Sequence, residues 1–101
     1  MARKYKLESI KRSTKDGKKY MATFTNKKTG RSKTTHFGAA GMSDYTKHKD
    51  DERKKRYLSR HRSNEDWNDP TKAGTLSRYV LWNKKGLRAS ISDYKRRFNF
   101  D

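Results

Sequence analysis

The sequence has 101 residues with a formal net charge of +17, and only 29% of the residues are hydrophobic, which fits one small basic domain over residues 1–101. The absence of cysteine excludes a disulfide framework, a thiolate zinc site and a cysteine nucleophile. No apolar run approaches the roughly 20 residues of a membrane span, and the start, MARKYKLES, has no apolar signal region, so we expect no secretion by a signal peptide.

Residues 3–37 have the alternating pattern of a three-stranded antiparallel meander. In the first strand the alternation breaks at Ile10, which indicates a bulge or a strand end. Asp16-Gly17 is a strong hairpin signal, and a second turn is predicted around Gly30. In the strand between these turns, one face carries three apolar side chains: Tyr20, Ala22 and Phe24.

Residues 38–43, GAAGMS, are predicted to form a flexible connection that turns the chain from sheet to helix. Their backbone N–H groups are also candidates for an anion nest. A charged surface helix is predicted over residues 47–62, because acidic residues precede a basic run, the order that the helix dipole favours. Two acid–base pairs in this segment have the i,i+4 spacing of helical ion pairs: Asp51 with Lys55, and Glu52 with Arg56.

Two further helices are predicted, over residues 75–84 and 88–98. Thr75 is in position to cap the first helix. Ser90 and Asp93 have capping-box spacing, so the second helix can begin as late as residue 91. The predicted class is α+β, a meander followed by three helices. The last helix has an apolar stripe at helical spacing: Leu87, Ile91, Tyr94 and Phe98.

The histidines are the first candidates for chemistry. His36, His48 and His61 are widely spaced, unlike the ligands of a compact metal site. Asp44 and Asp50 lie near His48, so a small metal-dependent nuclease stays open as a third hypothesis. No serine stands in a nucleophile motif, and GAAG lacks the GK[ST] of a phosphate-binding loop. We therefore expect no enzyme activity, no catalytic residue, no cofactor, no metal and no small-molecule substrate.

The basic clusters are the main functional signal. A solvated surface does not need an excess of seventeen positive charges, and a polyanion would relieve their self-repulsion. Clusters that share one side would neutralise on the order of 6–10 phosphates. The residues predicted to bind nucleic acid or another anion are Lys11, Arg12, Lys18, Lys19, Lys27, Lys28, Arg31, Lys33, Arg53, Lys54, Lys55, Arg56, Arg60, Arg62, Lys84, Lys85, Arg88, Lys95, Arg96 and Arg97.

Sequence-specific readout and base stacking are less favoured. We find no DNA-reading motif in the sequence. Stacking on bases needs an aromatic ring on an exposed face. Tyr45, Tyr57 and Trp67 are the candidates, and packing inside the molecule is favoured for each of them.

Four segments within residues 34–100 stand out together: HFGAAGMSDYTKHKDDERKKRYLSRH, WNDP, AGTLSRYVLW and SISDYKRRF. With these segments, residues 34–100 resemble small basic proteins encoded by large double-stranded DNA viruses of algae and protists, of the phycodnavirus and mimivirus type. The resemblance implies a viral protein that works near viral DNA or in the particle. It does not assign a catalytic or binding role to any residue. The residues that it assigns to the fold signature are Gly38, Gly41, Tyr45, Trp67, Pro70 and Trp82.

A fainter resemblance, to the WGR domain, rests on the meander segments KYKLESI and GKKYMATFTN. His36-Phe37-Gly38 stands where that domain has its Trp-Gly-Arg turn. We treat this resemblance as one of topology only.

The charge predicts a non-enzymatic protein that binds a polyanion, with nucleic acid as the favoured partner, and the resemblance implies a virion protein with viral DNA as that partner. The alternative is a minor capsid or cement protein whose charge docks on acidic faces of major capsid proteins. The expected location is the virion, and the host cytoplasm or nucleus during assembly. DNA, RNA and acidic protein all stay open as partners, as does the oligomeric state.

Overall fold

The computed structural model describes residues 4–63 and 66–100. It confirms the α+β class: three strands, β1 (Tyr5–Arg12), β2 (Lys18–Asn26) and β3 (Ser32–Ala39), form an antiparallel sheet in the order β1-β2-β3. The helical elements are α1 (Tyr45–His48), α2 (Asp51–His61), α3 (Ala73–Leu76), the π-helical turn η1 (Ser77–Leu81) and α4 (Leu87–Arg97). None of the helices in these ranges is long and apolar enough to cross a membrane.

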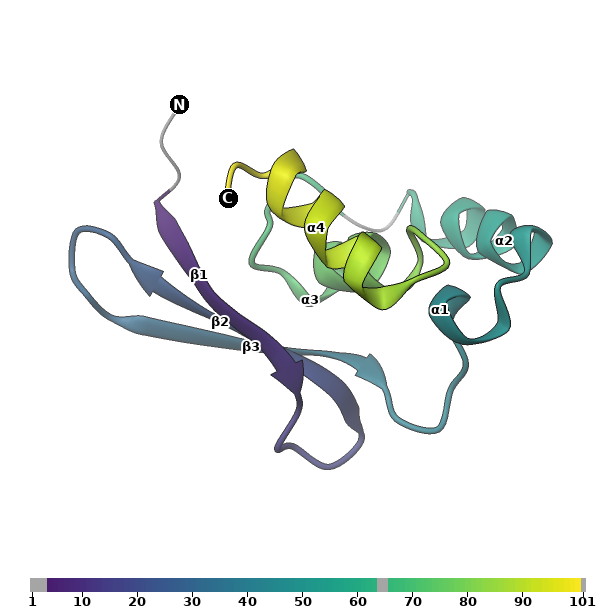
Figure 1. The fold of residues 1–101 in the computed structure, drawn as a ribbon, viewed down its shortest axis with the longest axis horizontal. Helices are drawn as coiled ribbons and strands as arrows, with labels where there is room; N and C mark the ends of the chain where they lie inside the picture. The colour runs from purple at the N-terminus through teal and green to yellow at the C-terminus, as the bar shows by residue number, and fades with distance from the viewer. Residues whose placement is uncertain (1–3, 64–65, 101) are drawn as a thin grey trace.

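The helices lie on one side of the sheet (Figure 1). α3, η1 and α4 cover the sheet itself, whereas α1 and α2 lie beyond the end of β3. The molecule measures 42 × 31 × 25 Å. The β2–β3 hairpin and α2 stand at opposite ends of the longest dimension (Figure 1).

Of the two interpretations of the break at Ile10, a bulge or a strand end, the structure shows the bulge. Leu7 pairs with Phe24, but the register shifts between Leu7 and Ser9, and Ile10 then pairs with Ala22. The extra residue returns Ile10 to the face that Leu7 occupies, so both side chains pack against the core.

The core lies between the sheet and the C-terminal helices. The predicted inner face of β2 is confirmed, since Ala22 and Phe24 are fully buried, together with Phe37 of β3. Across from them, the helical side contributes Leu76, Val80, Leu81, Tyr94 and Phe98. Burying each large side chain of this kind contributes about 1.5–3 kcal/mol.

The helix predicted over 47–62 is two helices in the structure. Asp44 caps α1, and Lys49, in the left-handed region at φ 55°, ends it. Asp50 then caps α2 by accepting hydrogen bonds from the backbone N–H groups of Glu52 (3.0 Å) and Arg53 (3.3 Å). Two capping aspartates so close together start two short helices in place of one.

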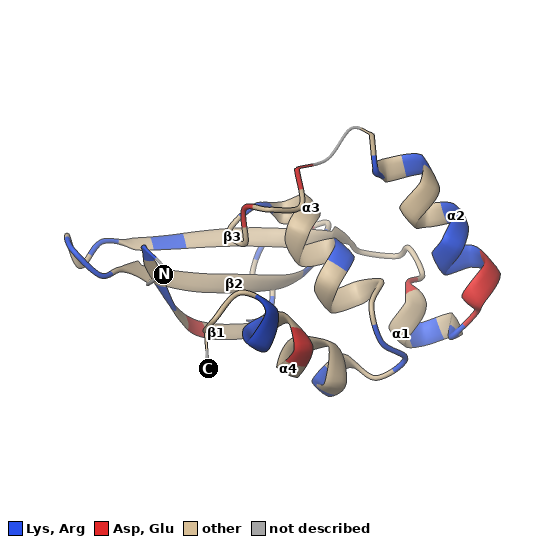
Figure 2. Cartoon of the chain, turned by 90° about the horizontal axis from the view of Figure 1, so that it is seen from above, with Lys and Arg blue, Asp and Glu red and all other residues tan. Residues whose placement is uncertain are grey.

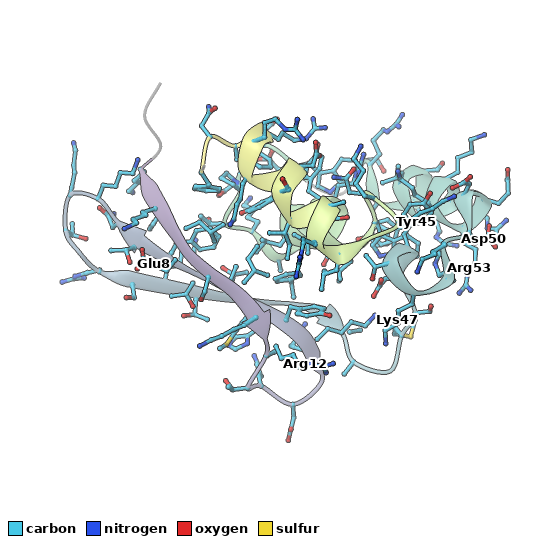
Figure 3. The ribbon with its side chains drawn as sticks, in the orientation of Figure 1. Glu8, Arg12, Tyr45, Lys47, Asp50 and Arg53 are labelled. Carbon is cyan, nitrogen blue, oxygen red and sulfur yellow. The ribbon has the colours of Figure 1, made fainter. Side chains whose placement is uncertain are left out.

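The ion pairs predicted along this segment do not form among the described residues. Neither Asp51 with Lys55 nor Glu52 with Arg56 comes within ion-pair distance. The Asp51 carboxylate instead accepts a hydrogen bond from the hydroxyl of Tyr45. Figure 3 shows where α1 meets α2, at the side chains of Tyr45, Asp50 and Arg53.

The boundaries of the helix predicted over 75–84 were wrong. α3 begins at Ala73, and Thr75 does not cap it, because the buried Thr75 hydroxyl donates to the Asp66 carbonyl (3.1 Å). The helix then widens into η1, where the Trp82 N–H donates to the Ser77 carbonyl (3.0 Å), and ends at Leu81. Such π-turns occur often at functional sites.

The last helix, predicted over 88–98, runs from Leu87 to Arg97, with Gly86 at its N-cap. Ser90 and Asp93 do not form a capping box. The Ser90 hydroxyl accepts from the Lys84 N–H (2.9 Å), and Asp93 accepts from the Asn83 side-chain amide (2.7 Å). The capping side chains expected from local spacing are thus used in tertiary hydrogen bonds.

Candidate anion-binding cleft

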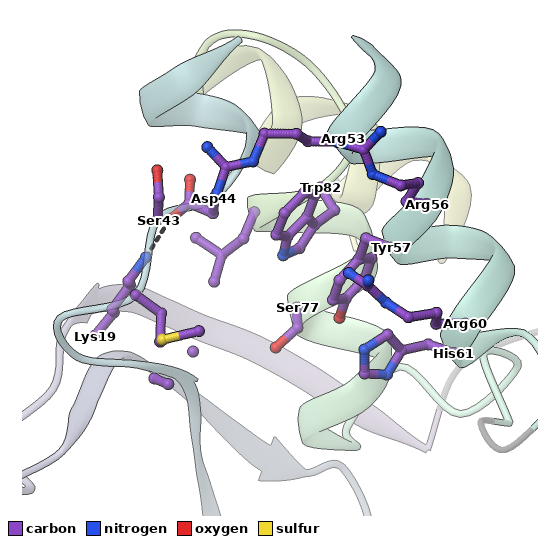
Figure 4. Close-up of a pocket in the computed structure, with 14 residues that line it drawn as sticks. Lys19, Ser43, Asp44, Arg53, Arg56, Tyr57, Arg60, His61, Ser77 and Trp82 are labelled. Carbon is purple, nitrogen blue, oxygen red and sulfur yellow. Dashed lines mark hydrogen bonds and ion pairs between the residues drawn. The ribbon is translucent and has the colours of Figure 1, made fainter. Parts of the chain in front are cut away.

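A cleft of about 550 Å³ opens between α2, η1 and the connection that follows β3 (Figure 4). α2 forms one wall, and Lys19, Ser43 and Asp44 lie on the opposite side, with Trp82 and Tyr57 between them. The lining residues are Lys19, Gly38, Ala39, Met42, Ser43, Asp44, Arg53, Arg56, Tyr57, Arg60, His61, Ser77, Leu81 and Trp82.

Three arginines make the α2 wall of the cleft positive. Arg53, Arg56 and Arg60 follow i, i+3 and i+7, so they share one stripe of the helix. All three are exposed. No acidic side chain of the described chain lies within ion-pair distance of any of them. Guanidinium groups match phosphate and carboxylate oxygens with two parallel hydrogen bonds, so this wall suits an oxyanion ligand.

The opposite wall is neutralised internally by one ion pair. Lys19 Nζ lies 2.5 Å from Asp44 Oδ2, and their side chains are only 9% and 2% exposed. Asp44 also accepts the Thr46 N–H (2.9 Å) as the cap of α1. Burial raises the pKa of Asp44, but the hydrogen bonds from Lys19 and Thr46 outweigh it, and the pKa lies below its usual value. Asp44 is therefore ionised at neutral pH and paired, and it does not repel an anion in the cleft.

Close packing between β3 and η1 sets the floor of the cleft. Gly38 has φ +78°, and a Cβ atom there would lie 2.7 Å from Leu81 Cδ1. Glycine accepts that backbone conformation and leaves room for Leu81, so the chain can turn away from the sheet directly above η1.

A column of stacked rings fastens α2 to the rest of the molecule. The Tyr57 ring stacks on Trp82 (4.2 Å, 2°) and on His61 (4.2 Å, 29°), and it lies between them in Figure 4. Trp82 also lies 5.2 Å from the ring of His48. Tyr57 therefore packs inside the molecule, as the sequence analysis favoured.

Lys54 is a second fastening of α2. Its ammonium group donates to the Asn83 carbonyl (2.6 Å) and lies 4.9 Å from the centre of the Tyr45 ring. Burial lowers the pKa of Lys54, and the neighbouring charges of Arg78 and Lys84 lower it further. Lys54 thus serves the fold, although it belongs to the predicted binding set.

The family of unknown function DUF5754 matches residues 8–61 of the chain. The chain belongs to this family. The matched segment includes the arginines of α2, whereas η1 and α4 lie outside it. Comparisons with curated proteins and with solved structures give no match. The resemblances to viral proteins and to the WGR domain stay predictions.

In this DUF5754 chain the predicted basic residues are distributed over elements at both ends of the molecule. Figure 2 shows separate Lys and Arg segments along the ribbon, at the β2–β3 hairpin as well as on α2. The structure brings Arg53, Arg56 and Arg60 together on the cleft and pairs Lys19 internally. The predicted residues that are exposed away from the cleft lining are Lys11, Arg12, Lys18, Lys27, Lys28, Arg31, Lys33, Lys55, Arg62, Lys84, Lys85, Arg88, Lys95, Arg96 and Arg97.

Some of these exposed residues have internal partners. Lys33 Nζ donates to the Thr71 hydroxyl (2.9 Å). Arg96 and Arg97 lie 3.9 and 3.7 Å from the carboxylate of Asp93. The positive charges of Lys33, Arg96 and Arg97 are therefore partly engaged by side chains of the protein itself.

Sequence reasoning missed two hydroxyls of the cleft, those of Ser43 and Ser77. They lie 34 positions apart, and no local motif marks either of them. Their position in the cleft follows from the packing of η1 against the end of β3, which a local pattern does not reveal.

The residues considered for a metal site are used in local structure. His48 Nδ1 accepts the Asp50 N–H (2.9 Å), Asp44 pairs with Lys19, and Asp50 caps α2. His36 Nδ1 lies 2.7 Å from the Ser13 hydroxyl. Over residues 4–63 and 66–100, no three His, Asp or Glu side chains come together in a group that would hold a metal ion.

Proposed function

We propose that this protein binds nucleic acid without sequence preference, as a non-enzymatic structural protein of a virus particle with viral DNA as its favoured ligand. The observation that carries the binding proposal is the row of arginines on the α2 wall, which no described acidic side chain neutralises. The viral setting is supported by the sequence resemblance over residues 34–100.

The physical basis of the proposed binding is electrostatic. Each Lys or Arg that contacts a phosphate releases condensed counterions, so affinity falls steeply as salt rises. Phosphate contacts carry no sequence information, which fits the absence of a DNA-reading motif in the sequence. Exposed basic residues at both ends of the 42 Å molecule extend the contact beyond the cleft.

A salt titration against random-sequence duplex DNA tests this proposal. We expect sub-micromolar binding at low salt and a log–log slope of about −5 or steeper, because several phosphates are contacted at once. An acidic protein of similar size serves as the control. A shallow slope, or equal binding to the acidic protein, would contradict nucleic acid as the ligand.

A minor capsid or cement protein is the second candidate. The presence of Lys and Arg at both ends of the molecule favours it, because a chain that holds several neighbours needs more than one basic contact region (Figure 2). The same titration separates the two candidates, since a cement protein should bind acidic protein surfaces at least as well as DNA.

A further inference from the structure

We infer that the α2 cleft, defined by its arginine wall and its Ser43 and Ser77 hydroxyls, holds the sugar–phosphate backbone of the nucleic acid and makes no stacking contact with its bases. This inference rests on the proposed function and names the part of the ligand that the cleft recognises.

The charge and spacing of the arginine wall suit successive phosphates of one strand. Lys19 and Asp44 cancel each other, so the charged lining leaves the three arginines in excess. Arg53 and Arg60 are about 10 Å apart along the helix axis, at ~1.5 Å per residue. Within a DNA duplex, each strand carries about three phosphates over that length of the duplex axis, at ~3.4 Å of axial advance each. Each arginine can therefore contact a different phosphate.

The rest of the polar lining also suits a backbone ligand. Ser43 and Ser77 contribute hydroxyl groups from the connection and from η1, across from α2. Serine hydroxyls and arginines are among the groups that contact phosphates and sugars in complexes with DNA. A strand in the cleft is thus approached by charged donors on one side and uncharged donors on the other.

The Tyr57 ring, at the centre of the cleft lining, does not offer a platform for bases. Both faces of the Tyr57 ring are covered, by Trp82 and by His61, and Trp82 itself lies against Tyr57 and beside His48. Where a protein does stack bases on open rings, each base raises affinity by roughly 5- to 150-fold. Because Tyr57 is closed to bases and Trp82 lies between Tyr57 and His48, we expect no such contribution, and affinity should not depend on whether bases are present.

An abasic oligonucleotide tests the role of the bases directly. The full chain is titrated with a labelled oligothymidylate and with a strand of the same length whose residues are abasic, and binding is followed by fluorescence anisotropy. We expect the two dissociation constants to agree within about 2-fold, because phosphates supply the contacts. A loss of about 10-fold or more with the abasic strand would show that bases stack on the protein, and would overturn the inference.

Two matched triple variants test the position of the site. R53Q/R56Q/R60Q removes the arginine wall, and K27Q/K28Q/R31Q removes the same charge from the β2–β3 hairpin at the far end of the molecule. The cleft variant should make the log–log slope of the binding constant against salt concentration shallower by about 2–3, and it should weaken binding by about 10-fold or more. The hairpin variant should weaken it by about 3-fold or less.

The outcomes distinguish the inference from the function on which it rests. Equal losses in the two variants would overturn the cleft as the site and leave nucleic-acid binding intact. A wild-type chain that binds neither strand would overturn the proposed function itself. Thermal unfolding and the charge-preserving variant R53K/R56K/R60K control for misfolding: the lysine variant should retain most of the binding, and a loss equal to that of the glutamine variant in a folded protein would contradict a phosphate site.

Inorganic polyphosphate distinguishes the source of the phosphates. As a competitor at equal phosphate concentration, it should displace the oligonucleotide no more than about 3-fold better than unlabelled oligothymidylate does. Displacement that is about 10-fold better would show that polyphosphate is the ligand and would overturn nucleic acid.

Discussion

Lys19 and Asp44 form an ion pair that is almost completely withdrawn from water, at the point where the sheet meets α1. A buried pair of this kind is strongly destabilising to break by removing one partner, because the other charge is left without compensation. Asp44 also caps α1, so the pair joins the beginning of β2 to the start of the helical region. At the scale of single residues, this contact holds in place the wall of the cleft that lies opposite α2.

Replacing one partner of the pair should therefore cost more than replacing both. We expect Lys19→Met to lower the free energy of unfolding by about 3–5 kcal/mol, since Asp44 stays buried without its cation. The double variant K19M/D44N should recover a large part of that loss, because asparagine is also a good N-cap. Urea unfolding of the wild type, K19M, D44N and K19M/D44N gives the coupling free energy between Lys19 and Asp44. Additive losses of stability would contradict a buried pair.

The pH dependence of stability has the sign set by the lowered pKa of Asp44. Above the pKa of Asp44 in the unfolded chain, near 3.8, the pair contributes its full stabilisation to the folded state. That stabilisation is lost as the pH falls through the lower pKa of Asp44 in the folded state. We expect the wild type, compared with K19M/D44N, to lose stability more steeply below about pH 4. Parallel acid titrations of stability measure this difference, and superimposable curves would contradict it.

At the scale of elements, the cleft exists because α1, α2 and the backbone turn at Gly38 are arranged around η1. α2 is attached through the Tyr57–Trp82 stack and through Lys54, and β3 approaches η1 at Gly38. These contacts join segments that are far apart in the chain. A change that separates β3 from η1 should therefore alter the cleft without touching its arginines.

Gly38→Ala tests the approach of β3 to η1. The new Cβ would meet Leu81 at 2.7 Å, at a backbone angle that alanine disfavours, so we expect a loss of roughly 2–4 kcal/mol of stability. Gly41→Ala is the matched control. Gly41 has a similar φ of +85° but nothing within 4 Å of its Cβ position, so only the backbone term of about 1–2 kcal/mol applies. Equal losses in chemical unfolding would show that the contact with Leu81 is unimportant.

At the scale of the whole molecule, the sheet depends on helices from the other end of the chain. Phe24 and Phe37 are covered by side chains of α3, η1 and α4, which lie outside the segment that matches the family. The positive charge is distributed over both ends of the molecule, so self-repulsion opposes compaction throughout. A chain this basic needs its whole core to stay folded.

A fragment of residues 1–62 should therefore fail to fold. It would lose the partners of Phe24 and Phe37, at about 1.5–3 kcal/mol for each buried side chain, against a typical domain stability of only about 5–15 kcal/mol. We expect no cooperative thermal transition by circular dichroism, whereas the full chain under the same conditions should show one. A cooperative transition in the fragment would show that the family segment is an independent domain.

Much of the fold could be predicted from the sequence because its signals are local. Alternation along β2, the Asp16-Gly17 turn and the break at Ile10 each depend on a few neighbouring residues, and the sheet, its inner face and the bulge are confirmed. Helix ends were predicted less well, because Thr75 and Ser90 use their hydroxyls in tertiary hydrogen bonds in place of capping.

The sequence by itself determined the α+β class, the excess of positive charge and the basic run on the helix predicted over 47–62, since composition and periodicity do not require knowledge of distant contacts. Only the tertiary structure decided that Lys19 is paired with Asp44, that Lys54 is directed inward, and that the arginine stripe faces a cleft. Those features depend on which distant side chains meet when the core forms, and packing in three dimensions, not spacing along the chain, selects them.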